Sequence, residues 1–145
     1  MIGLSDGISK NIVESALKNK KHVITANKAL IAKHGDYLSF LAEKNFVNLE
    51  FEAAVGGGMP ILRTLKDGLA TNKIRKVIGI LNGTCNYILS KMQSTKETFP
   101  KVLKKAQLLG YAEIMNPKLD LNGQDTLSKV RILSALAFNK KISNN

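Results

Sequence analysis

Apolar residues in the first third of the chain follow helical and strand spacing in turn. Over residues 8–18 they recur three and four positions apart, which predicts a short amphipathic helix. Residues 22–25 form a short apolar run typical of a strand, and helical spacing resumes over residues 29–42. Gly35 and Asp36 interrupt this second pattern and indicate two helical pieces. The alternation predicts the end of an α/β unit.

After Asn48 the pattern changes from alternation to a series of helices. Residues 47–55 and 74–81, both rich in apolar residues, are two further strand candidates. A helix is expected from Met59 onward, with Pro60 in its first turn. Two strands followed by successive helices suit an α+β arrangement, so we place a domain boundary near Asn48. The remaining predicted helices cover residues 84–92, 100–109 and 125–138.

Composition places the chain among soluble globular proteins. It has 145 residues, of which 44% are hydrophobic, and no apolar run approaches the length that spans a bilayer. The first residues carry neither a basic leader nor an apolar run, so no secretory signal is expected. A single cysteine excludes an internal disulfide framework and suits a reducing compartment. We therefore expect a cytoplasmic protein that has no contact with a membrane.

The formal net charge of +11 favours attraction to phosphate groups without identifying them. Most basic residues are lysines, whereas recognition of bases and bidentate binding of phosphate tend to use arginine. Many lysines fall on predicted helix faces or ends, where a solvated surface is favoured over a nucleic-acid patch. The charge therefore predicts no nucleic-acid partner.

Three consecutive glycines, Gly56, Gly57 and Gly58, join a predicted strand to the helix expected at Met59. Glycine tolerates positive φ, so such a bend can turn several carbonyl oxygens toward one point, and hard cations prefer oxygen ligands. The alternative is a tight connection in which the backbone simply has to fit, and spacing alone favours it. The cluster is not a GxGxxG dinucleotide fingerprint, because Pro60 follows where that loop would continue.

Polar residues mark two predicted helix starts. Asn27 and Lys28 follow a strand, and ligands of open α/β sheets bind at the carboxyl ends of strands. Lys28 would then face a phosphate or a carbonyl oxygen; alternatively, Asn27 caps the helix and Lys28 is solvated. Asn82 and Thr84 begin another helix, whose free N–H groups can receive an anion, although a plain helix cap is favoured on local grounds.

An acid-rich loop precedes the last predicted helix. Glu113 and Asp120 lie among turn-forming residues, and Asp125 and Lys129 are four apart, so the latter two project from one helical face. A protonated lysine can give a proton to a developing alkoxide, and the carboxylates can hold a substrate ammonium group. Spacing is equally compatible with an exposed ion pair beside an acidic surface loop.

Five segments resemble, in chain order, the signature segments of homoserine dehydrogenase. They are VITANKAL, EAAVGGGMPI, GILNGTCNYIL, AQLLGYAE and DLNGQDTLSKVRILSALAF, and the similarity runs from about Gly3 to Phe138. The resemblance implies NAD(P)-dependent interconversion of L-aspartate 4-semialdehyde and L-homoserine, on the route to threonine, methionine and isoleucine. It also implies a homodimer formed through the catalytic domain.

The resemblance assigns roles in the substrate pocket. Lys129 matches the family's proton-donating lysine, and Asp125 matches its acidic partner at the substrate. Glu113 matches the glutamate that binds the homoserine amino group, and Asp120 matches an acidic residue that lines the same pocket. The loop after Glu113 is one residue longer than usual, with Asn116 where the family has an acid.

The resemblance also assigns cofactor and cation sites. Lys28 and Gly110 match positions that contact the nicotinamide cofactor, NADP or NAD. The family binds sodium, or a similar monovalent cation, largely through backbone carbonyls; the matching residues are Glu52, Val55, Gly57 and Met59.

The family's fold implies two incomplete domains. Residues 1–48 would be the C-terminal remnant of a Rossmann-type dinucleotide-binding domain, and residues 49–145 part of an α+β catalytic and dimerisation domain, with a mixed sheet covered by helices. The glycine fingerprint of the family is absent, so we expect an internal fragment. The competing hypothesis is a non-catalytic basic binding or assembly module, with nucleic-acid binding the least favoured function.

Overall fold

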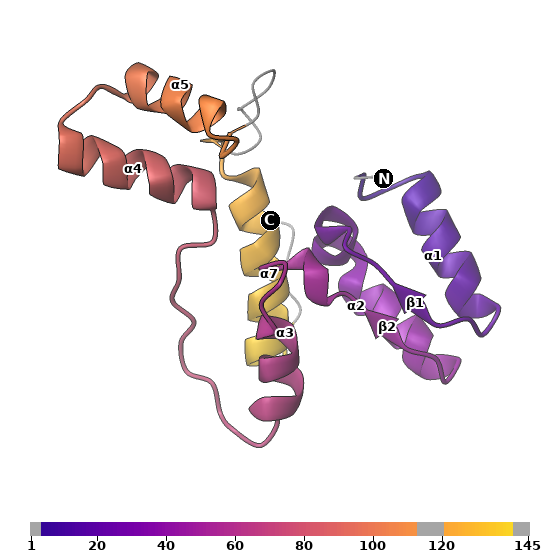
Figure 1. The fold of residues 1–145 in the computed structure, drawn as a ribbon. Coiled ribbons are helices and arrows are strands. Elements are labelled where there is room, and N and C mark those ends of the chain that lie inside the picture. The colour runs from indigo at the N-terminus through magenta and orange to yellow at the C-terminus, as the bar shows by residue number, and fades with distance from the viewer. Residues whose placement is uncertain (1–3, 113–120, 141–145) are drawn as a thin grey trace. The chain divides into compact units, whose positions relative to one another are not determined.

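The computed structural model describes residues 4–112 and 121–140 (Figure 1). The chain divides into two compact units. The first comprises Met1–Val77 together with Ser128–Asn145, and the second comprises Ile78–Leu127. No helix among the described residues is both long enough and apolar enough to cross a membrane.

The first unit begins with alternating helices and strands: α1 (Ile8–Lys18), β1 (Val23–Ile24), α2 (Lys28–Lys44) and β2 (Leu49–Glu50). The strands pair in parallel, with Val23 opposite Leu49 and Ile24 opposite Glu50. Parallel pairing requires a crossover between the strands, and α2 provides it. The predicted alternation of helix and strand is confirmed, although the strands are much shorter than the apolar runs suggested.

The helix α2 is continuous, so the predicted break at Gly35 and Asp36 is wrong. Its buried residues lie on both sides of Gly35, Leu30 and Ile31 before it and Leu38 after it. This burial outweighs the roughly 1 kcal/mol by which glycine weakens a helix interior. Glycine also fits closely here, because a Cβ at Gly35 would lie 3.3 Å from Cγ2 of Ile31.

An aromatic residue follows α2 in an unusual conformation. Phe46 has φ of 56°, in the left-handed region, and is 94% exposed. A non-glycine residue there costs about 1–2 kcal/mol, and this ring gains almost nothing from burial. Phe46→Gly is therefore expected to raise the free energy of unfolding by about 1 kcal/mol, measured by urea denaturation.

Phe40 provides the matched control for this substitution. It is also exposed, at 61%, but lies inside α2, where glycine is unfavourable. Phe40→Gly should therefore lower the free energy of unfolding by about 1 kcal/mol. The same sign for both variants would contradict the conformational explanation.

Short helical turns follow β2 in place of the expected long strand. They are the 3₁₀ turn η1 (Glu52–Ala54), α3 (Ile61–Arg63) and the π-helical turn η2 (Thr64–Gly68). The strand predicted at residues 74–81 is also wrong: in the described part of the chain, β1 and β2 are the only paired strands. A strand needs a partner for its backbone groups, which periodicity alone cannot supply.

The second unit contains a helical hairpin, α4 (Gly83–Thr95) and α5 (Phe99–Leu108) (Figure 1). Lys105 closes its loop by donating to both carboxylate oxygens of Glu97 at 2.7 Å, which lowers the pKa of that carboxyl. The last helix, α7 (Gln124–Phe138), begins in the second unit and continues into the first. The hairpin core consists of Ile88, Val102, Ala106 and Ala112.

Candidate functional site

Lys28 begins α2 just beyond the carboxyl end of β1, at the position predicted from the sequence. Asn27 caps this helix, because its side-chain oxygen accepts the backbone N–H of Leu30 at 3.1 Å. Its side-chain nitrogen donates to the carbonyl of Leu4 at 3.0 Å, so Asn27 also ties the N-terminal segment to the helix start. Lys28 itself is half-buried rather than fully solvated. The predicted cap is confirmed. Asn27, the residue before Lys28, is thus hydrogen-bonded both to the N-terminal segment and to the first turn of α2.

The Asp6 carboxylate also connects the N-terminal segment to α2. Asp6 accepts hydrogen bonds from Lys33 at 2.6 Å and pairs with Nε2 of His34 at 2.8 Å. The Lys33 ammonium, followed by His34, holds the pKa of Asp6 far below its ordinary value. Such a lowered pKa stabilises the fold at neutral pH, and this contribution is lost as pH falls through the acid range.

The glycine turn is a tight connection built around Glu52. Both oxygens of its carboxylate accept backbone N–H groups at 2.9 Å, one from Leu62 and one from Arg63. These are unpaired donors at the start of α3, so the Glu52 side chain acts as a helix cap. Gly56 and Gly58 have φ of 64° and 84°, which confirms the backbone freedom expected of this turn.

The described atoms at this turn that could act as ligands of a hard cation are oxygen atoms. No group of three or more His, Cys, Asp or Glu side chains suited to a metal ion occurs in the part of the chain that the structure describes. The Glu52 carboxylate is already engaged, and Met59 is 63% exposed with a thioether side chain. The remaining oxygen atoms are the backbone carbonyls from Glu52 to Met59, of which those of Glu52 and Met59 also accept the N–H groups of Val55 and Ile61. A carbonyl oxygen has a second lone pair, and hard cations accept such ligands.

The start of α4 is joined to the end of α5. Asn82 caps α4, accepting the backbone N–H of Cys85 at 2.7 Å, so the locally favoured prediction of a cap is confirmed. The Thr84 hydroxyl donates to the carbonyl of Tyr111. Gly110, which lies just before Tyr111, is exposed and has φ of 77°. The sequence offered no signal for the contact between Thr84 and Tyr111, because it joins distant positions.

The predicted pair on the last helix lies within α7. Asp125 and Lys129 are four positions apart and both are half-buried. Glu113 and Asp120, the other acids predicted for this site, lie outside the described residues.

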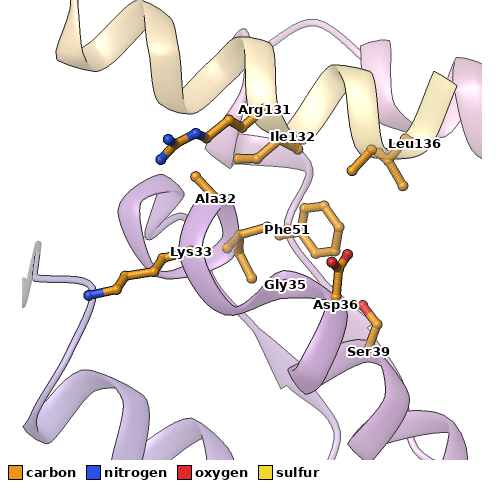
Figure 2. Close-up of a pocket in the computed structure, with 11 residues that line it drawn as sticks. Ala32, Lys33, Gly35, Asp36, Ser39, Phe51, Arg131, Ile132 and Leu136 are labelled. Carbon is orange, nitrogen blue, oxygen red and sulfur yellow. The ribbon is translucent and has the colours of Figure 1, made fainter. Parts of the chain in front are cut away.

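A small pocket of about 80 Å³ lies in the first unit, between α2 and α7 (Figure 2). Figure 2 shows Lys33 and Arg131 toward one side and Asp36 and Ser39 toward the other, with the Phe51 ring beside Asp36. Among the described residues, none of those predicted for the substrate, cofactor or cation sites lines it. No sequence pattern indicates this pocket, because its walls come from segments far apart in the chain.

Comparisons with known proteins show the class of protein. Residues 5–52 match the family model described as "Homoserine dehydrogenase, NAD binding domain", so the class is that of dehydrogenases with an NAD-binding domain. Residues 60–145 match the model described as "Homoserine dehydrogenase". Together the two models cover most of the chain. The chain belongs to the homoserine dehydrogenase family, and the resemblance found in its motifs is confirmed.

Similar proteins agree with this assignment. The homoserine dehydrogenase of Neisseria gonorrhoeae is 51% identical over 132 residues, which are 91% of this chain and 30% of the relative. That of Bacillus subtilis is 46% identical, over 92% of this chain and 31% of the relative. The chain thus spans about 30% of the length of these relatives.

Solved structures show the same relationship. A crystal structure of a homoserine dehydrogenase from Thiobacillus denitrificans matches with a TM-score of 0.87 at 46% identity, over 94% of this chain and 31% of that one. A hyperthermophilic archaeal homoserine dehydrogenase in complex with NADPH matches with a TM-score of 0.85 at 30% identity, over 92% of this chain and 41% of that one.

Proposed function

We propose that this chain is part of an enzyme that interconverts L-aspartate 4-semialdehyde and L-homoserine with NADP or NAD. The observation that carries the proposal is the ordered match of both family models, the NAD-binding domain at residues 5–52 and homoserine dehydrogenase at residues 60–145. The relative solved with NADPH supports NADP as the cofactor. In the proposed reaction the bound nicotinamide supplies or accepts the hydride, while the protein orients the substrate and moves the proton.

Lys129 is proposed to give its proton to the oxygen of the reduced aldehyde. Its place on α7, one helical turn after Asp125, lets the carboxylate orient the ammonium group or the substrate. Glu113 and Asp120 are proposed to complete the site by binding the substrate amino group. In the reverse direction Lys129, once neutral, would take the hydroxyl proton of homoserine.

Lys28 and Gly110 are proposed to contact the cofactor. Lys28 fits this role because its backbone is fixed by the Asn27 cap at the carboxyl end of a parallel strand. Gly110 fits because a Cβ built on it would meet nothing within 4 Å, so a ligand can approach its backbone. A sodium ion, or a similar cation, is proposed at the carbonyls of Glu52, Val55, Gly57 and Met59.

The finer architecture is part of the same proposal. Residues 1–48 would belong to a Rossmann-type domain, and residues 49–145 to a catalytic domain whose mixed sheet is covered by helices. The parallel pair β1 and β2 supports the first assignment. We further propose a cytoplasmic homodimer that serves threonine, methionine and isoleucine biosynthesis.

The test is an assay of the intact polypeptide that carries this chain. Homoserine should drive reduction of NADP or NAD, followed by absorbance at the wavelength of the reduced nicotinamide. Isothermal titration with homoserine and with each nucleotide separates binding from turnover. A protein that binds neither ligand, but binds arbitrary DNA in a strongly salt-dependent manner, would replace this proposal with nucleic-acid binding.

A further inference from the structure

The turn at Gly110 is fixed locally by the end of α5. Its N–H donates to the carbonyl of Gln107 at 3.1 Å, and the N–H of Tyr111 donates to the carbonyl of Ala106 at 2.9 Å. With a positive φ at Gly110, these bonds form a Schellman motif, a common way to end a helix. The motif orients the turn relative to α5, but not relative to the neighbouring helix.

The helix α4 holds the same turn from its other side. The Thr84 hydroxyl donates to the Tyr111 carbonyl, and Thr84 is only 7% exposed. The Tyr87 ring stacks on the Tyr111 ring, with centroids 4.6 Å apart and planes inclined by 19°. Thr84 and Tyr87 are three positions apart on α4, so one helical face provides both contacts.

Apolar packing already joins the two helices without these contacts. Ala112 is 4% exposed and lies in the core cluster with Ile88, Val102 and Ala106. These side chains form the buried core of the hairpin, but the hydrophobic effect is not directional and does not by itself set the orientation of the turn. The hydrogen bond and the ring stack are directional, so they define where Tyr111, the residue after Gly110, lies against α4.

We propose that Thr84 and Tyr87 are positioning residues that hold the Gly110 turn in the geometry needed to receive the nicotinamide cofactor. The inference rests on the proposed function, because the cofactor contact of Gly110 belongs to it. Neither side chain needs to touch the cofactor. Each acts through Tyr111, the residue that follows Gly110.

The test compares Thr84→Val and Thr84→Ser in the intact polypeptide. Valine keeps the volume and removes the hydroxyl donor, whereas serine keeps the donor. Thr84→Val should raise the dissociation constant of NADPH, measured by nucleotide fluorescence, about fivefold to tenfold. Thr84→Ser should stay within about twofold of wild type, because its hydroxyl retains the bond. Tyr87→Leu, which removes the stack and keeps an apolar side chain, should weaken binding in the same direction.

Amide hydrogen exchange gives a readout that does not depend on the cofactor. Thr84→Val should speed exchange at Tyr111 and Ala112 and leave exchange in the middle of α4 unchanged. Thr95→Val is the matched control, because the Thr95 hydroxyl also donates to a carbonyl, that of Lys91 at 2.8 Å, but at the other end of α4. This control should change neither the exchange at Tyr111 nor the affinity for NADPH.

Several results would overturn the inference. They are unchanged exchange at Tyr111 in Thr84→Val, an equal loss of NADPH affinity in Thr95→Val, or failure of Thr84→Ser to restore binding. Failure of the proposed function appears differently, as a wild-type protein that binds neither NADPH nor NADH. In that case, faster exchange in Thr84→Val would still show that Thr84 stabilises the Gly110 turn. The proposed role of this turn in cofactor binding would nevertheless be refuted.

Discussion

Replacing Lys129 by alanine is expected to lower kcat of the intact enzyme by about 10²–10⁴-fold, the range typical of lost general acid–base catalysis. The proposed role requires a proton on the lysine nitrogen when the aldehyde oxygen gains charge. Alanine removes that proton donor without touching the proposed cofactor contacts at Lys28 and Gly110. The affinity for NADPH, measured by nucleotide fluorescence, should therefore change by less than about threefold.

Two controls separate proton transfer from a general loss of positive charge. Lys129→Arg keeps the charge, but its guanidinium does not release a proton in the working pH range, so turnover should remain low. Lys91→Ala removes an exposed lysine of α4 and should leave kcat unchanged. Turnover in Lys129→Ala equal to that of wild type would refute the role assigned to Lys129.

Helix positions could be predicted from the sequence because they depend on local spacing. The helix α1 occupies the predicted residues, and α4, α5 and α7 each begin within one residue of the expected start. Strands were predicted less well, since a segment rich in apolar residues, such as residues 74–81, specifies no partner strand. The continuous α2 also escaped prediction, because the burial that overrides Gly35 comes from tertiary packing.

For the candidate site, the sequence indicated residues and their order along the chain. Motif order indicated Lys28, Gly110, Asp125 and Lys129, and the structure describes all four within or beside helices. Their roles remain predictions, because roles depend on the ligands they meet. The contact of Thr84 with Tyr111 joins positions far apart in the chain, so no spacing rule could reveal it.

Glu52 shows how a residue can carry a structural role in addition to the one assigned by resemblance. Glu52→Ala is expected to lower the free energy of unfolding by about 1.5–3 kcal/mol, because hydrogen bonds to a charged group are lost at Leu62 and Arg63. Leu62 is 1% exposed, so its N–H has little access to water as a replacement. Urea denaturation with a constant m-value would measure the loss.

The choice of substitution distinguishes the cap from the cation site. Glu52→Gln keeps one side-chain acceptor, so it should lose only part of the stability that alanine loses. Glu43→Ala, at an exposed position of α2, should change stability by less than about 0.5 kcal/mol.

If sodium binds through backbone carbonyls, as proposed, it should raise the melting temperature of Glu52→Gln as much as that of wild type, relative to choline at equal ionic strength. A sodium effect present in wild type and lost in Glu52→Gln would instead make the carboxylate a cation ligand, in addition to its hydrogen bonds to α3.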